Sequence, residues 1–66
     1  MRITVNGEDM MMDDRCSVAD LLARCGLPDA PCAVEVNRSL VPKREHDAHE
    51  LQEGDVIEIV TLVGGG

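Results

Sequence analysis

The sequence contains no phenylalanine, tryptophan or tyrosine among its 66 residues. Its core must therefore be aliphatic and rich in methionine, and aromatic platforms for stacking nucleic-acid bases are excluded. Basic residues are also scarce, since six Lys and Arg oppose 13 Asp and Glu and leave a formal charge of −7. This charge repels phosphate backbones, so nucleic acid is not an expected partner. A protein partner with a basic groove fits better, although solubility alone also explains an acidic surface.

Long hydrophobic runs are absent as well. No stretch approaches the roughly 20 apolar residues that a membrane helix needs. The opening residues MRITVNGEDM also lack the apolar segment of a signal peptide. We therefore expect a cytoplasmic protein without a membrane partner.

Cysteine and histidine are too few for a disulfide framework or a metal site. Cys16, Cys25 and Cys32 are odd in number and include no Cys-x-x-Cys pair, so we expect reduced thiols. Cys25 falls on a helical apolar stripe, which predicts a small core residue. His46 and His49 lie in an acidic segment without a fixed third ligand, which predicts a solvated loop and no bound metal.

What the chain does have is a hydrophobic pattern whose period changes along its length. Ile3 and Val5 alternate with polar residues before Asn6-Gly7, and the methionines 10–12 follow. An Asn-Gly pair between two such runs predicts a β-hairpin, because both central residues of the turn need positive φ. At least one of the three methionines is expected to face outward.

A helical period follows the hairpin. Val18, Leu21, Leu22 and Cys25 recur at i, i+3, i+4 and i+7, which predicts one short amphipathic helix. Ser17 with Asp20 predicts a capped start, and Gly26 predicts a left-handed stop.

The second half of the sequence returns to strand patterns. Residues 33–37 alternate, Leu40-Val41 predicts a short edge strand that Pro42 ends, and residues 56–63 form the longest β-rich run. The order of elements predicts an α+β protein with β-grasp architecture, in which one helix packs across a mixed sheet of four to five strands. We expect the last strand to lie centrally beside the first. The predicted domain covers residues 1–63, and a flexible glycine tail covers residues 64–66.

Alternation along the last strand separates two faces. Because a carboxylate is rarely left unpaired in a core, Glu58 is expected to face outward and Ile57 and Ile59 inward. Val60 and Leu62 then lie on the open face with Glu58, where we expect a partner-binding surface.

The three final glycines, Gly64, Gly65 and Gly66, suggest chemistry on the main chain itself. A segment without side chains fits a narrow enzyme channel, in which a terminal carboxylate could be attacked beside bound ATP. Carboxylates do not react with nucleophiles until an oxygen becomes part of a leaving group, and adenylation achieves this. The protein would then be a substrate and not an enzyme.

Several stretches together resemble the ubiquitin-like sulfur carriers, most closely the ThiS type of thiamin biosynthesis. They are MRITVNGE, SVADLL, AVEVNRSLVPKRE, LQEGDVIEIV and the Gly65-Gly66 end, and they span nearly the whole chain. The resemblance implies that a ThiF-like enzyme uses ATP to adenylate Gly66 and that a persulfide sulfur donor displaces AMP. The resulting thiocarboxylate would supply sulfur to thiazole synthase, and the carrier itself would bind no cofactor.

Other functions share this pattern. The small subunit of molybdopterin synthase has the same fold and tail chemistry, and ubiquitin-like modifiers use the same activation to form an amide with lysine. A different class is a non-catalytic β-grasp adaptor with an inert tail.

Overall fold

The computed structural model describes residues 1–27 and 31–61. The elements are β1 (Arg2–Val5), β2 (Glu8–Met11), α1 (Val18–Arg24), β3 (Cys32–Val36), β4 (Ser39–Val41), the 3₁₀ helix η1 (Lys43–Glu45) and β5 (Val56–Thr61). Leu62 and the predicted glycine tail over residues 64–66 lie outside the described residues. The division of the chain into a domain over residues 1–63 and a tail therefore stays a prediction.

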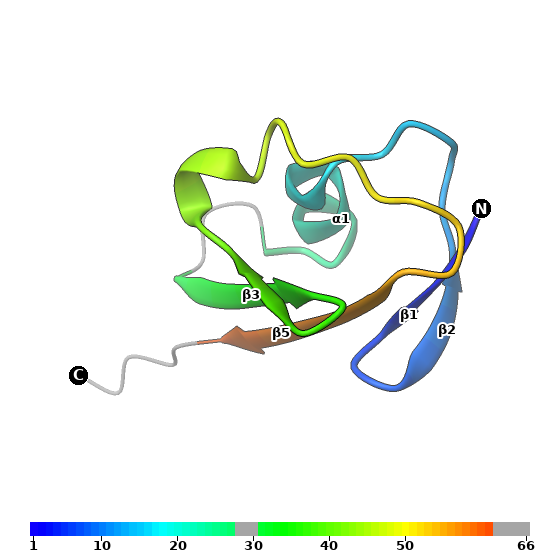
Figure 1. The fold of residues 1–66 in the computed structure, drawn as a ribbon, viewed down its shortest axis with the longest axis horizontal. Helices are drawn as coiled ribbons and strands as arrows, with labels where there is room; N and C mark the ends of the chain where they lie inside the picture. Colours follow the sequence, from blue (N-terminus) through cyan, green and yellow to red (C-terminus); the bar gives the residue numbers. More distant parts are fainter. Residues whose placement is uncertain (28–30, 62–66) are drawn as a thin grey trace.

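The five strands form one mixed sheet in the order β2-β1-β5-β3-β4. β1 and β5 are parallel, with Val5 opposite Ile57, and the other neighbouring strands are antiparallel. β5 thus lies in the middle of the sheet beside β1, and α1 lies across one face (Figure 1). The predicted α+β fold, with its central last strand and single helix, is confirmed.

Both hairpins turn through pairs of residues with positive φ. Asn6 and Gly7 join β1 to β2 with φ of 50° and 85°, which confirms the turn predicted from Asn-Gly. Asn37 and Arg38 join β3 to β4 with φ of 52° and 71°. The second turn has no glycine, and of its two residues Asn37 accepts positive φ more readily than Arg38 does.

The ends of α1 follow the signals in the sequence. The Ser17 hydroxyl accepts a hydrogen bond from Asp20 N–H at 3.1 Å, and the Asp20 carboxylate accepts one from Ser17 N–H at 2.9 Å. These two bonds form the predicted capping box. At the other end Gly26 has φ of 79°, and Leu27 N–H donates to Leu22 O at 2.7 Å. This reversal brings Leu27 back against the core.

The core lies between α1 and the inner face of the sheet, and it is entirely aliphatic and sulfur-containing. Its buried residues are Ile3, Met12, Cys16, Val18, Leu21, Leu22, Val34, Val36, Val41, Leu51, Ile57 and Ile59. Every strand except β2 contributes a buried side chain to this set. Within residues 1–27 and 31–61, no helix has the length and hydropathy needed to cross a membrane.

The prediction that Cys25 is a core residue is wrong, because the structure leaves Cys25 exposed. α1 ends at Arg24, and Cys25 is the cap residue at which the chain begins to reverse. Leu27, two residues further on, is the partly buried residue that packs against the core after the helix.

The prediction that His46 belongs to a solvated loop is also wrong, because His46 is 8% exposed. The short helix η1 folds this segment inward and brings His46 Nε2 to 3.1 Å from Val41 O. Ala19 N–H also donates to His46 O at 3.0 Å, which joins the segment to the first turn of α1. The residues around His46 in the sequence are polar, so the sequence alone does not indicate that His46 is buried.

Candidate functional site

The predicted site residues of β5 divide between the two faces as alternation requires. Ile57 and Ile59 are buried under α1, whereas Val56, Glu58 and Val60 are exposed on the opposite face. The outward orientation of Glu58 and Val60 is thereby confirmed. Leu62 lies beyond the described part of the chain, so its place on this face stays a prediction.

Exposed apolar side chains gather on the face of the sheet that carries no helix. Val56 is 48% exposed, Val60 58% and Leu40 65%. Leu40 lies opposite Glu35, which in turn lies opposite Glu58, so β4, β3 and β5 all contribute to one surface. We call these five residues, Glu35, Leu40, Val56, Glu58 and Val60, the outer-face patch.

Two like charges lie at the centre of the outer-face patch. Glu35 and Glu58 are directly opposed across the antiparallel pair of β3 and β5, and both are exposed. Like charges in this position destabilise a sheet. Neither carboxylate takes part in an ion pair within residues 1–27 and 31–61, where the acids that do are Asp14 and Glu45. The patch therefore combines apolar surface with a concentrated negative charge.

Sequence reasoning did not assign Glu35 or Leu40 to this surface. Alternation in residues 33–37 already indicated that Glu35 faces away from Val34 and Val36. Its position opposite Glu58 depends on the register between strands that are distant in the chain, and no local signal reveals that register.

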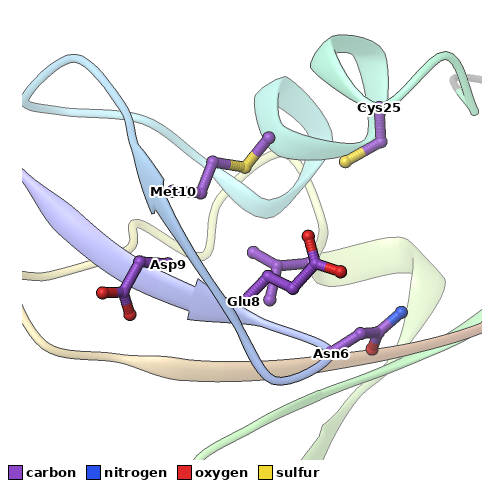
Figure 2. A pocket seen from close by; sticks show the side chains of 6 residues that line it. Asn6, Glu8, Asp9, Met10 and Cys25 are labelled. Carbon is purple, nitrogen blue, oxygen red and sulfur yellow. The ribbon is translucent and has the colours of Figure 1, made fainter.

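An open hollow of about 290 Å³ lies elsewhere, between the β1–β2 hairpin and the end of α1. Figure 2 shows Glu8, Asp9 and Met10 projecting from β2, and Cys25 from the end of the helix. The lining includes Val5 and Asn6 but no basic side chain that would stabilise a thiolate on Cys25. This composition does not support a nucleophilic site in the hollow.

The other thiols are less accessible than Cys25. Cys16 is buried and Cys32 is partly buried. Burial raises the pKa of the Cys16 thiol, and repulsion by the nearby Asp20 and Asp13 carboxylates raises it further. Cys16 therefore keeps its proton and packs as a small apolar residue.

The strand order, the parallel pairing of the first and last strands and the single crossing helix define a ubiquitin-like β-grasp protein. The crystal structure of the thiamine biosynthesis protein ThiS from Geobacter metallireducens is similar over 100% of both chains, with a TM-score of 0.83 and 30% identity. The model of the ThiS family matches residues 1–66. The chain belongs to the ThiS family.

Two curated relatives differ in how much of their length this chain covers. The sulfur carrier protein ThiS of Bacillus subtilis is 38% identical over 65 residues, which are 97% of this chain and 98% of the relative. Thiazole synthase of Paramagnetospirillum magneticum is 35% identical over 66 residues, which are 100% of this chain but 20% of the relative. The chain thus spans one fifth of the length of that larger protein.

Proposed function

We propose that this protein carries sulfur for thiamin biosynthesis as a thiocarboxylate on Gly66. The observation that best supports the proposal is the similarity to the sulfur carrier protein of Bacillus subtilis over nearly the whole of both chains. The folded domain acts as a carrier and a substrate, and not as a catalyst. Gly64 and Gly65 keep the approach to the Gly66 carbonyl thin enough to enter a partner's active site.

The chemistry proceeds through an activated main-chain carboxylate. A carboxylate oxygen of Gly66 attacks the α-phosphorus of ATP, which a ThiF-like enzyme binds, and pyrophosphate leaves. The terminal sulfur of a persulfide donor then attacks the carbonyl carbon and displaces AMP. A thiol cleaves the resulting sulfur–sulfur bond, which leaves the thiocarboxylate on Gly66 and a disulfide on the donor side. The carrier needs no cofactor of its own for these steps.

The outer-face patch is the proposed docking surface for the adenylating enzyme and for thiazole synthase. Glu58 and Val60 lie on β5, and Leu62 follows this strand in the sequence shortly before the glycines. Burying Val60 and Val56 against a partner removes apolar surface from water, and a partner's basic side chain placed between Glu35 and Glu58 relieves their repulsion. A relative named thiazole synthase that contains a segment 35% identical to this whole chain supports that enzyme as the acceptor.

The test is to incubate the protein with ATP, a ThiF-like enzyme and a persulfide source, and then to weigh it intact. Replacement of one oxygen by sulfur supports the proposal. Attachment to a lysine of another protein identifies a modifier, and an unchanged mass identifies an adaptor. Either of these two results contradicts the proposal.

Two tail variants test which atom reacts. Deletion of Gly66 and the substitution Gly65→Val are both expected to abolish conversion, because the first moves the terminal carboxylate one residue back, to Gly65, and out of reach of the bound ATP, and the second widens the segment. Circular dichroism serves as the control and is expected to match the wild-type spectrum. Conversion of either variant at the wild-type rate would contradict the assignment to Gly66.

A further inference from the structure

The side chain of Asn6 holds the last part of β5. Its Oδ1 accepts a hydrogen bond from Ile59 N–H at 2.8 Å, and its Nδ2 donates to Ile59 O at 3.2 Å. Both polar groups of one carboxamide are therefore used on the two main-chain groups of one strand residue. Ile59 is two residues before Thr61, at which β5 ends.

This contact extends the hydrogen-bond ladder between β1 and β5 by one step beyond the last main-chain bond of β1. Thr4 N–H donates to Asp55 O and Asn6 N–H donates to Ile57 O, both at 2.9 Å, as in a regular parallel pair. The next bond would join the Asn6 carbonyl to Ile59 N–H, but the chain turns away at Asn6-Gly7. The Asn6 carboxamide takes the place of the missing peptide group.

The end of β5 is consequently held on both sides. On one side β3 pairs with β5 as far as Cys32 opposite Thr61. On the other side β1 pairs with β5 only at Thr4 and Val5, and beyond them the contact with Ile59 is made by Asn6.

Asn37 makes a similar arrangement at the opposite end of β5. Its Oδ1 accepts from Val56 N–H at 2.9 Å, and its Nδ2 donates to Asp55 Oδ1 at 3.0 Å. Asn37 and Asn6 have nearly the same φ, and each lies at the first position of a hairpin turn. The two residues differ chiefly in which end of the strand they hold.

We propose that Asn6 is a positioning residue for the reaction at Gly66, because it fixes the direction in which β5 leaves the domain. The inference rests on the proposed function. A strand held on both sides up to Ile59 gives the predicted flexible tail one starting direction, which raises the fraction of docked molecules whose carbonyl is correctly placed. Asn37 holds the start of the strand and has no such effect.

The test compares Asn6→Gly with Asn37→Gly. Glycine accepts positive φ at both positions, and each substitution removes two side-chain hydrogen bonds, so the two variants are expected to lose similar amounts of stability. For Asn6→Gly we expect the rate constant kcat of adenylation to fall about tenfold, while affinity for the adenylating enzyme stays within about twofold of wild type. Asn37→Gly is expected to keep both values.

A second readout does not depend on activity. Nuclear magnetic resonance order parameters for the amides of residues 59–61 are expected to fall in Asn6→Gly and to keep their wild-type values in Asn37→Gly. If Asn6→Gly does not fold, Asn6→Asp replaces it, since aspartate keeps the acceptor for Ile59 N–H and loses the donor. A smaller loss of the same kind is then expected.

The outcomes separate this inference from the proposed function. Unchanged order in residues 59–61 of Asn6→Gly, or an equal loss of kcat in both glycine variants, overturns the positioning role. If the wild-type protein is not converted at all, the proposed function fails and the positioning role at Gly66 fails with it, whereas the order parameters still show whether Asn6 holds the end of β5.

Discussion

The two faces of β5 are built from alternate residues of a single strand and have opposite surroundings. Ile57 and Ile59 lie under α1 in an aliphatic core, whereas Val56, Glu58 and Val60 face solvent on the side without a helix. The inner residues have the composition that folding demands. The outer face instead combines exposed valines with a repulsive Glu35–Glu58 pair, which folding does not require.

This difference indicates that the inner face of β5 serves the stability of the domain, whereas the outer face is available for recognition of a partner. A chain of this length is expected to have a free energy of unfolding of roughly 3–10 kcal/mol. The exposed valines and the opposed carboxylates of the outer-face patch contribute little to that value, and an exposed apolar patch on a monomer is typical of an interaction site. Within the proposed function, its composition is explained by a partner that covers it.

The largest expected effect is on the inner face. Ile57→Ala should lower the free energy of unfolding by about 2–5 kcal/mol, because it leaves a cavity at a fully buried position. Val56→Ala on the outer face is the matched control, with an expected loss of less than about 0.5 kcal/mol. Urea unfolding followed by circular dichroism measures both, and equal losses would remove the distinction between the faces.

The next effect concerns docking. Val60→Glu should weaken binding to a ThiF-like enzyme about tenfold or more, because a third carboxylate would be buried without a partner. The free energy of unfolding should fall by less than about 1 kcal/mol, because the new carboxylate adds to the repulsion on this face. Met11→Glu is the control, since Met11 is 62% exposed but lies on β2, two strands from β5. Isothermal titration calorimetry that finds the same loss for both variants would place the docking surface elsewhere.

A smaller effect is expected at the carboxylate pair. Glu58→Gln removes the repulsion with Glu35 and should raise the free energy of unfolding by about 0.2–1 kcal/mol. The same substitution should weaken binding to the adenylating enzyme and reduce the salt dependence of that binding. Glu35→Gln should give the same gain in stability, and the double variant should gain less than the sum. Additive gains would mean that the two charges do not interact.

The smallest expected effect concerns the thiols, where buried Cys16 is compared with exposed Cys25. Because burial raises the pKa of Cys16, the folded thiol keeps its proton to a higher pH than the unfolded thiol. The corresponding stability is fully present below the unfolded pKa of about 8.5 and is lost as pH rises through the folded pKa. Melting temperatures measured from pH 7 upward should therefore decline in the alkaline range.

Alkylation followed by mass spectrometry tests the same contrast directly. Exposed Cys25 should react first and buried Cys16 last. Modification of Cys16 at the rate of Cys25 in the folded protein would contradict the assigned burial.

The elements of this fold could be predicted because their signals are local. Asn6-Gly7, the Ser17–Asp20 capping box and Gly26 each act within a few residues, and the structure confirms all three. Alternation along β5 likewise predicted that Val60 and Glu58 face outward, and the structure confirms it.

The errors and omissions share a different cause. Cys25 and His46 were misplaced because their burial depends on how the chain reverses after α1 and after β4. The opposition of Glu35 and Glu58 and the contact between Asn6 and Ile59 depend on strand register and on side chains replacing peptide groups. Such long-range contacts leave no periodic trace in the sequence.

The central position of β5 also determines what happens to an incomplete chain. Without β5, the β1–β2 and β3–β4 hairpins have no shared neighbour, and isolated two-stranded hairpins are marginally stable in water. A polypeptide that stops before Val56 therefore yields no smaller sheet and no docking surface. Under the proposed function, prematurely terminated products cannot compete with intact carriers for the enzymes that handle sulfur.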